Sequence, residues 1–452
     1  VWVLGGPLET AAILVQLNAG SLYRSQWGWI VLAMAILVAI IVAADFFINV
    51  NRFSLHAIYR NRLIRAFLGG PHPERTADGF TGYDPKDNLR VHELWDEQEL
   101  EGGDWRPFHV INMTLNLAAT KRLEWQQRRA ESFTVTPQYC GCANLGYRET
   151  KKYGDPGGGI SLGTAMAISG AAVSPNMGYH SSPSIAFLLT LLNVRLGWWL
   201  GNPGPAGSRD GAIIGFVKRK ITWISRSRRP RPAYHLDAPR FSLRPLLVEL
   251  FGLTDDESPY VYLSDGGHFE DLGIYEMVRR RCRWIVVSDA DADPDRGFED
   301  LGNAVRKIWI DLGVRITFEK SDLLRATGDT AAIGIPYCAL GTIEYLNDGD
   351  GSTKGKILYI KPAVRGDEPA ADIIAYLRAH EDFPHQSTTE QWFDEPQLES
   401  YRALGYWMTK RIVDGARRAG PINTPEEFFN SLERLDFSTI ERKDMWGIHA
   451  AA

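Results

Sequence analysis

The chain has 452 residues and a net charge of −5, with 44% hydrophobic and 23% charged residues. These proportions are typical of a globular protein and exclude a disordered or fibrous one. The negative net charge argues against a nucleic acid as partner. The four cysteines lack the paired spacing of a zinc site, so we expect reduced thiols in a reducing compartment, with no metal and no cofactor.

The N-terminal region contains one uncharged run of eighteen residues, Trp27–Ala44. About 20 apolar residues suffice to cross a bilayer, and the apolar pattern continues past Asp45. We therefore expect a transmembrane helix with Trp27 and Trp29 in the interfacial belt. The alternative is a buried core helix, although helices of globular proteins usually keep one polar face.

Charges on either side of this run predict its orientation. Only Arg24 lies just before it. Four arginines follow it closely, namely Arg52, Arg60, Arg62 and Arg65. The positive-inside rule therefore predicts an integral membrane protein in which the residues after about 50 face the cytoplasm.

A basic connection follows the apolar run, with the sequence RFSLHAIYRNRLIRAFLGG from Arg52 to Gly70. Apolar and arginine residues alternate in it as in a helix that lies on an anionic membrane surface. A core helix with a solvated basic face is an equally good interpretation. Residues 70–106 are polar and rich in Pro, Gly and Asp, which predicts a surface loop. We therefore divide the chain into a membrane-spanning segment (1–50), this connection and loop (51–107), and one larger domain (108–445).

From residue 108 onward the pattern alternates between strands and helices, which predicts an α/β fold with three layers. The apolar run WIVVS suits a strand buried in a parallel sheet. The predicted strands are His109–Leu115, Ala212–Val217, Ile221–Ser225, Tyr260–Ser264, Trp284–Ser288 and Ile357–Lys361. The predicted helices are Ser184–Leu192, Arg244–Phe251, Leu272–Arg281, Phe298–Leu312, Ile373–Ala379 and Glu395–Ala416.

The stretch Tyr260–Arg281, YVYLSDGGHFEDLGIYEMVRRR, concentrates the features of a site. Asp265 falls where the alternating strand would stop, and open α/β sheets hold their chemistry at the carboxyl ends of strands. Gly266 and Gly267 allow backbone angles closed to other residues and leave the carboxylate uncrowded. The alternative is an ordinary strand–turn–helix corner, since Asp-Gly is a common turn pair.

Other polar residues have competing interpretations. Asp289, Asp291 and Asp293 alternate as in a calcium loop, but Pro294 stands where such a loop needs glycine, so a polar strand end is the alternative. His268 could orient a lipid headgroup or hydrogen-bond the turn, and His180 lies near the same supposed site. A last group, Arg195, Trp198 and Trp199, suits either acyl contact at the membrane or core packing.

The segment SDGGHFEDLGIYEMVRRRC resembles the Asp-Gly-Gly segment of bacterial patatin-like phospholipases, which are related to lysophospholipase and cytosolic phospholipase A catalytic domains. The resemblance extends over about residues 50–445, through four further segments in the expected order. These segments are Phe108–Gly141, Gly159–Pro183, Leu191–Pro203 and Arg283–Pro294. It implies a patatin-like three-layer α/β sheet with flanking helices, preceded here by a transmembrane helix.

Catalysis in that family uses a serine–aspartate dyad with a glycine-rich oxyanion loop, and Asp265 matches the aspartate. Gly266 and Gly267 then form the active-site loop. Ahead of residue 150 we find no glycine-rich loop followed by a Gly-x-Ser-x-Gly elbow. We therefore expect this chain to be the C-terminal part of a longer protein, inactive alone, with the nucleophile upstream. Ser161 in Gly-Ile-Ser-Leu-Gly is an alternative nucleophile, and Ser169 a second one, although the resemblance places their segment beside the site.

The resulting expectation is a membrane-anchored lipid acyl hydrolase that takes phospholipid or lysophospholipid from the bilayer. A carboxylate within reach of a serine hydroxyl can accept its proton as the ester is attacked. The alternative is a non-catalytic membrane scaffold that keeps the patatin-like fold. A glycine-rich loop and a serine elbow upstream of Val1 would decide for the enzyme.

Overall fold

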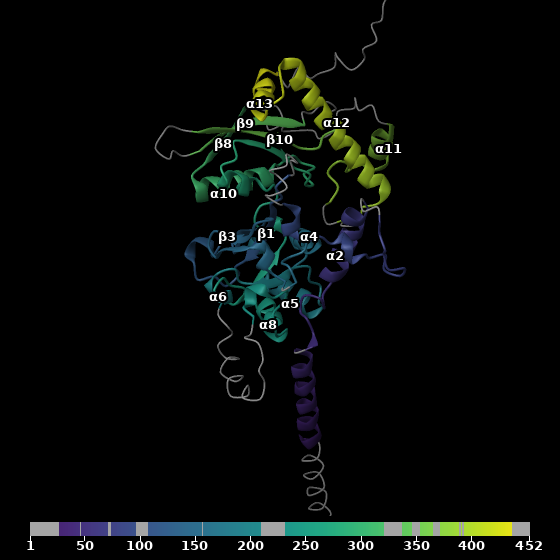
Figure 1. Ribbon diagram of the computed structural model, residues 1–452, viewed down its shortest axis with the longest axis vertical. Helices are drawn as coiled ribbons and strands as arrows, with labels where there is room; N and C mark the ends of the chain where they lie inside the picture. The colour runs from purple at the N-terminus through teal and green to yellow at the C-terminus, as the bar shows by residue number, and fades with distance from the viewer. Residues whose placement is uncertain are drawn as a thin grey trace, which may run out of the picture. The chain divides into compact units, whose positions relative to one another are not determined.

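The computed structural model describes residues 27–45, 47–70, 74–95, 107–155, 157–208, 231–320, 337–345, 353–364, 371–387, 390 and 393–435. These residues form mixed α/β structure in two compact units, residues 1–265 and 266–452 (Figure 1). Each unit contains its own sheet and is described by itself. The predicted strands Ala212–Val217 and Ile221–Ser225 lie outside the described residues.

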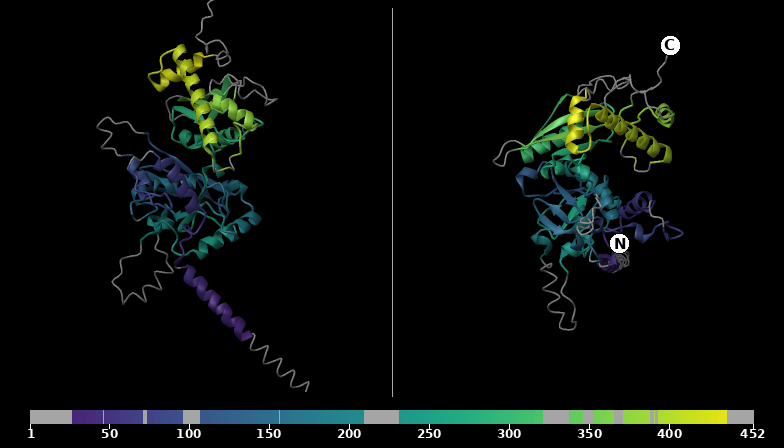
Figure 2. Two further views of the ribbon diagram at one scale, coloured as in Figure 1. Left: turned by 90° about the vertical axis from the view of Figure 1, so that its right-hand side faces the viewer. Right: turned by 45° about the horizontal axis from the view of Figure 1, so that its top comes forward.

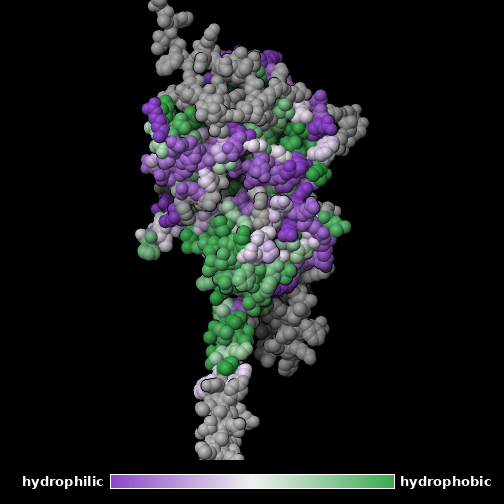
Figure 3. Space-filling view, turned by 180° about the vertical axis from the view of Figure 1, so that it is seen from behind, coloured by the Kyte–Doolittle hydropathy of each residue, from purple (hydrophilic) through white to green (hydrophobic). Residues whose placement is uncertain are grey.

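Unit 1 begins with the apolar helix Trp27–Asp45, which projects from the rest of the unit (Figure 2). Its mean hydropathy is 2.6 and none of it is buried, so the alternative of a core helix is not supported. Hydrophobic side chains cover its surface (Figure 3). At 1.5 Å per residue it is about 28 Å long, close to the thickness of the hydrocarbon core of a bilayer. The helix is therefore long and apolar enough to cross a membrane.

The sheet of unit 1 has six strands in the order β4-β3-β2-β1-β6-β5, and every neighbouring pair is antiparallel. The predicted strands at His109–Leu115 and Tyr260–Ser264 are confirmed as β1 and β6. Strands β3, β4 and β5 have only four residues each and contain glycine, which hides a period-2 pattern, whereas β2 has six residues without glycine and was also missed. The bounds are β1 (Ile111–Asn116), β2 (Ala130–Val135), β3 (Tyr139–Cys142), β4 (Gly146–Glu149), β5 (Trp198–Gly201) and β6 (Tyr260–Ser264).

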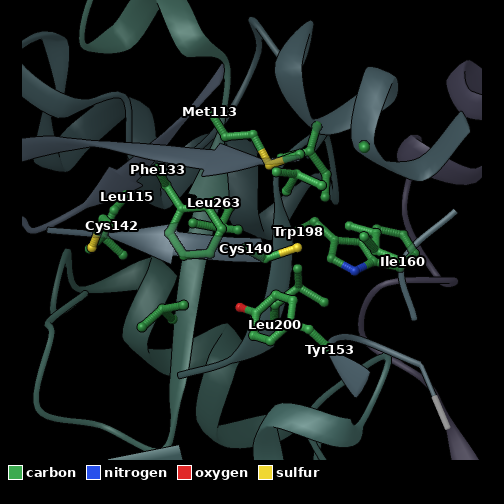
Figure 4. Packing of buried hydrophobic residues seen from close by; sticks show 14 of the residues in the cluster. Met113, Leu115, Phe133, Cys140, Cys142, Tyr153, Ile160, Trp198, Leu200 and Leu263 are labelled. Carbon is green, nitrogen blue, oxygen red and sulfur yellow. The ribbon is translucent and has the colours of Figure 1, made fainter. Parts of the chain in front are cut away.

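Helices surround this sheet, and α4 contacts both β1 and β6. The core lies on the sheet, where Met113, Phe133 and Leu263 project into one buried cluster (Figure 4). The helices are α2 (His56–Leu63), α4 (Leu162–Ser169), α5 (Pro183–Leu191), α6 (Pro205–Ser208) and α8 (Leu243–Leu250), with a π-helix η1 (Ile64–Gly69). Short 3-10 helices are η2 (Pro85–Asp87), η3 (Val91–Leu94), η4 (Leu123–Trp125), η5 (Thr150–Lys152), η6 (Gly178–His180) and η7 (Ala233–His235).

The basic connection after the apolar helix packs into unit 1. Helix α2 contacts α4, and a Cβ atom built on Gly163 of α4 would lie 2.4 Å from the Ile64 side chain. Farther along, Val91 is fully buried in the core, and Arg75 forms an ion pair of 2.8 Å with the buried Asp87. These contacts favour the core-helix interpretation of α2. They also show that residues 74–95 are more than a surface loop.

The chain that leaves the apolar helix is fastened to β5 through Asn51. The Asn51 side-chain amide donates to the carbonyl oxygens of Trp199 and Asp237, both at 2.8 Å, and its oxygen accepts the Trp199 N–H at 2.9 Å. Asn51 therefore occupies the place that a neighbouring strand would take at this edge of the sheet. The described sheet ends at β5, and side-chain hydrogen bonds replace the missing ladder there.

A buried ion pair lies beside this attachment. Nη1 of Arg195 is 2.6 Å from Oε1 of Glu249, and their side chains are 3% and 0% exposed. The same carboxylate oxygen accepts the indole N–H of Trp199 at 2.6 Å, and Nη2 of Arg195 donates to the Val50 carbonyl at 2.8 Å. Burial raises the pKa of Glu249, whereas Arg195 and the indole lower it. The pair thus joins α8, β5 and the chain that follows the apolar helix.

We predict that Arg195→Met destabilises unit 1 by about 3–5 kcal/mol, because it leaves the Glu249 carboxylate buried without its partner. The matched control is Lys121→Met, whose partner Glu257 is 65% exposed and whose own side chain is 79% exposed. That control should change stability by less than about 1 kcal/mol. Denaturant unfolding of the chain in detergent micelles measures both, and equal effects would contradict the prediction.

Unit 2 contains a four-stranded sheet in the order β7-β10-β9-β8. Strand β7 pairs with β10 in parallel, as its sequence predicted, and the other pairs are antiparallel. The expectation that β7 is buried on both faces is wrong, since Val286 is 56% exposed on this edge strand. The bounds are β7 (Trp284–Ser288), β8 (Arg315–Lys320), β9 (Cys338–Glu344) and β10 (Lys354–Ile360).

Four helices of unit 2, α9 to α12, agree closely with their predicted positions, whereas α13 was not predicted. Helix α12 begins after Asp394, whose side chain accepts the Gln397 N–H at 2.8 Å and so caps the first turn. Helix α10 ends at Gly313, whose φ of 65° suits the left-handed position that follows a helix. The bounds are α9 (Ile274–Arg279), α10 (Glu299–Leu312), α11 (Ala371–Ala379), α12 (Glu395–Ala419) and α13 (Pro425–Arg434), with the 3-10 helix η8 (Gly266–His268).

Candidate active site

Asp265 follows directly after β6, an interior strand of the sheet of unit 1. Strand β6 lies between β1 and β5, and its residues 261–264 are fully buried. The chain leaves the sheet at Asp265, which is half-buried. The structure therefore places this carboxylate at the carboxyl end of a buried strand, as the sequence predicted.

Gly266 and Gly267 begin unit 2 and form the 3-10 helix η8 with His268. The N–H groups of Phe269 and Glu270 both donate to the Gly266 carbonyl, at 3.0 and 2.9 Å. A 3-10 turn uses right-handed angles that any residue can adopt. The expectation of special backbone angles at these two glycines is therefore wrong. The left-handed residues of the stretch Tyr260–Arg281 are instead Gly273, with φ of 70° just before α9, and Arg281, with φ of 58° after it.

Tyr59 of α2 is the aromatic neighbour of Asp265, which sequence reasoning missed. Burial raises the pKa of the Tyr59 hydroxyl, and the negative charge of Asp265 raises it further. The same hydroxyl lies over Gly170 at the end of α4, where a Cβ atom would approach it to 2.7 Å. Tyr59 stays protonated near neutral pH, so it can act as a hydrogen-bond donor at this site. Its position in a basic amphipathic stretch hid this role.

Asn116, at the end of β1, ties two other segments to the strand that carries Asp265. Its amide donates to the Ser264 hydroxyl at 2.8 Å, and its oxygen accepts the Gly178 N–H at 3.0 Å. Asn116 is fully buried, so both bonds are shielded from water. The residue next to Asp265 is thus connected to the loop that follows α4.

Ser161, the alternative nucleophile, is the N-cap of α4. Its hydroxyl accepts the Thr164 N–H at 3.3 Å and bonds the Thr164 hydroxyl at 2.9 Å. Its backbone is extended, with φ of −83° and ψ of 153°, and turns precede it, whereas a nucleophile elbow needs a strained turn directly after a strand. From Ser161 to Gly170, the helix end beside Tyr59, the distance along α4 is about 13 Å. The structure therefore makes Ser161 a helix cap, and Ser169 lies in the last turn of α4, at the Tyr59 end.

Of the remaining residues that the sequence suggested for the site, three are part of the packed interior and two histidines have no role that the structure assigns. Arg195 belongs to the buried ion pair, and Trp198 and Trp199 are each 4% exposed, which confirms core packing. His268 is half-buried within η8. His180 ends η6, and its side chain lies outside the described part of the molecule.

In unit 2 a second aspartate follows a strand, but its charge is paired. Asp289 comes directly after β7 and accepts hydrogen bonds from Lys361 Nζ at 3.0 Å and from the Tyr359 hydroxyl. Asp289 and Lys361 are each 1% exposed. Asp293 lies 3.6 Å from Lys361 and accepts the Gly297 N–H at 2.7 Å. These bonds assign Asp289 and Asp293 to the polar strand end and not to a calcium loop.

Asp291 belongs to a separate cluster of three carboxylates, together with Asp271 and Asp300. Carboxylate oxygens of the three lie within 4.8 Å of one another, a spacing at which a hard divalent cation could be bound. Burial first, and then the negative charges of Asp300 and Asp289, raise the pKa of Asp291 to about 6. Burial and then the charge of Asp289 raise the pKa of Asp300 as well, although hydrogen bonds with Asp271 and Asp291 act against this rise. The group is thus an electrostatic cost to unit 2 near neutral pH.

We predict that Asp291→Asn stabilises the chain at pH 7.5 and that this gain disappears near pH 4. An unfolded aspartate releases its proton at a pKa of about 3.9, whereas folded Asp291 holds it to about 6, so stability falls as pH rises between these values. With allowance for solvent screening, we expect a gain of up to about 1 kcal/mol. Thermal unfolding in detergent measures it. Asp295→Asn, an exposed position in the same loop, is the control. A gain that does not depend on pH would contradict the explanation.

In comparisons with known proteins, no family model and no curated protein matched this chain. The chemistry of the site therefore has to be judged from its residues. Asp265 is a half-buried carboxylate at a strand end, with a protonated phenol nearby. Such a carboxylate can accept a proton from a hydroxyl nucleophile, and a phenol can orient it.

Proposed function

We propose that this chain belongs to a membrane-anchored lipid acyl hydrolase of the patatin-like type, in which Asp265 is the general base. The observation that carries the proposal is the grouping of the resembling segments around the end of β6. Asn116, Gly170 and Gly178 come from two of these segments, and Ser264 precedes Asp265 in the third. We further propose that the sheet of unit 1 is the part of a patatin-like three-layer arrangement that holds the base.

In the proposed reaction a serine hydroxyl attacks the ester carbonyl of a phospholipid or lysophospholipid. Asp265 accepts the hydroxyl proton as the new C–O bond forms, and then gives it to the leaving alcohol as the old C–O bond breaks. Water hydrolyses the acyl-serine in the second half, again with Asp265 as base. In this proposal Tyr59, which stays protonated, orients the carboxylate; the support is the effect of the Asp265 charge on the pKa of Tyr59. The resemblance assigns the serine to a Gly-x-Ser-x-Gly elbow, and the geometry of Ser161 argues against that residue.

We predict that Asp265→Asn lowers ester hydrolysis by the natural protein about 10²–10⁴-fold, because the amide keeps the shape but cannot accept the proton. The matched control is Ser161→Ala, which removes a helix cap. It should cost about 1 kcal/mol of stability and leave the rate unchanged. Release of fatty acid from phospholipid in mixed micelles is the measurement.

Three outcomes would change the proposal. Near-normal turnover of Asp265→Asn would remove Asp265 from the chemistry. Loss of both turnover and fluorophosphonate labelling in Ser161→Ala would make Ser161 the nucleophile. Absence of any ester hydrolysis by the unmodified protein would favour the alternative, a non-catalytic membrane scaffold.

We also propose that the helix Trp27–Asp45 spans a bilayer and that the residues after about 50 face the cytoplasm. The support is the length of the helix, its exposed apolar surface and the arginines that follow it. We predict that alkaline carbonate does not extract the protein from membranes. A reporter fused after Ala452 should be active on the cytoplasmic side, and activity on the opposite side would reverse the orientation.

A further inference from the structure

Unit 1 contains a cavity along α8 that the proposed hydrolase does not use. Its volume is about 160 Å³, and its walls are mainly apolar, with Trp199, Phe241 and Val248 among them. A wider depression of about 460 Å³ adjoins it and shares Phe241, Arg244 and Val248 with it. The two form one groove, which we call the α8 groove.

Three arginines line the α8 groove, namely Arg231, Arg240 and Arg244. Nη2 of Arg240 donates to the Arg231 carbonyl at 2.6 Å, and Nη2 of Arg244 lies 3.4 Å from the Ser258 hydroxyl. Among the described residues, neither Arg240 nor Arg244 forms an ion pair with a carboxylate. The charge of this wall is therefore available to a ligand.

Two acidic residues line the groove: Asp45, in the wider depression, accepts the Leu243 N–H, and Asp255, in the cavity, is hydrogen-bonded within its own turn. Its carboxylate accepts the N–H groups of Glu257 and Ser258, at 2.9 and 2.6 Å, and the Ser258 hydroxyl at 3.0 Å. It therefore stabilises the loop that closes the cavity. The balance of the groove is cationic beside an apolar surface, which suits an anionic amphiphile.

The α8 groove begins where the apolar helix ends. The Asp45 carboxylate accepts the Leu243 N–H at 2.6 Å, and the Ser242 hydroxyl donates to the Ile48 carbonyl. Asp45 also lines the wider depression. Because Asp45 closes the apolar helix, these bonds fix the start of α8 at the level where a spanning helix would leave the hydrocarbon.

Exposed apolar side chains of unit 1 lie beside the point where the apolar helix ends. On α8 and its end, Leu243, Leu247 and Phe251 recur every four residues and are 42%, 43% and 64% exposed. The neighbouring α5 exposes Leu188 and Leu191 at 53% and 66%. Both helices lie at the end of unit 1 from which the apolar helix leaves (Figure 1), and the hydrophobic surface is continuous with that helix (Figure 3). A bilayer is the partner that can cover a spanning helix and this surface together.

We propose that the α8 groove binds one anionic phospholipid from the leaflet at which the apolar helix ends. Its acyl chain lies against Phe241 and Val248, and its phosphate is held by Arg240 and Arg244. This is a second lipid site, separate from the proposed active site. Tyr260 lines the groove at the start of β6, whereas Asp265 follows the end of β6, about 17 Å away along the strand.

The test measures lipid binding by the full chain, purified in neutral detergent and freed of lipid. The probe is a diether phosphatidylglycerol, which has no ester to hydrolyse, so the result does not depend on the proposed activity. Diether phosphatidylcholine is the zwitterionic comparison, and native mass spectrometry counts the lipids bound. We expect one phosphatidylglycerol to be held in preference to phosphatidylcholine. Removal of both arginines in R240A/R244A should weaken it roughly 25-fold, about fivefold for each charge.

Three further variants separate charge, cavity and fold. R240K/R244K keeps the charges and should retain most of the affinity. Val248→Phe keeps the arginines but fills the groove, and should weaken binding. R306A/R378A removes two exposed arginines of unit 2 and should change nothing. Unchanged affinity in R240A/R244A or in Val248→Phe, or equal retention of phosphatidylcholine, would overturn the proposal. Displacement by excess inorganic phosphate would also overturn it, by assigning the arginines to a free-phosphate site.

Discussion

The ion pair between Arg195 and Glu249 is the constraint on which the arrangement of unit 1 depends. Two charges removed from water need further hydrogen bonds, and here the Val50 carbonyl accepts from Arg195 and the Trp199 indole donates to Oε1 of Glu249, whereas Oε2 of Glu249 has no partner among the described residues. The chain that leaves the apolar helix, the edge strand β5 and helix α8 are therefore joined at one point. Strand β6, which Asp265 directly follows, is the neighbour of β5. The ion pair takes no part in the proposed reaction. It nevertheless helps to fix the position of the proposed base, Asp265, relative to the end of the apolar helix.

Two Ser-Asp pairs end strands in this chain, and their surroundings give them different roles. Asp265 is half-buried near a neutral phenol. Asp289 is buried completely against an ammonium group and a second phenol, so its charge is committed to holding β7 to β10. The dipeptide and its position after a strand are the same in both cases. The neighbours that decide between a reactive and a structural carboxylate come from other parts of the chain, which is why the dipeptide alone predicts neither role.

Local patterns predicted the elements whose signal lies within one segment. The uncharged run gave the apolar helix, alternation gave β1 and β6, and amphipathic spacing gave α10 and α12. Strands β3, β4 and β5 were not predicted, because each is only four residues long and four positions are too few to show an alternating pattern. The partners of the candidate site escaped for another reason. Tyr59 comes close enough to feel the charge of Asp265 because α2 packs on α4, and Asp271 joins Asp291 and Asp300 only in the folded unit. Such contacts follow from tertiary structure, to which a one-dimensional pattern has no access.

The short, hydrogen-bonded passage from Asp45 to Asn51 has a kinetic consequence. A catalytic unit on a long flexible tether must find both the membrane surface and its own correct orientation before each encounter with a lipid. Here the first residues after the helix are bonded to α8 and β5, so in the proposed membrane setting unit 1 keeps one face toward the leaflet at all times. Its search for substrate is then diffusion in a plane. The rate of encounter should follow the mole fraction of substrate in the membrane, and not the amount of lipid in suspension.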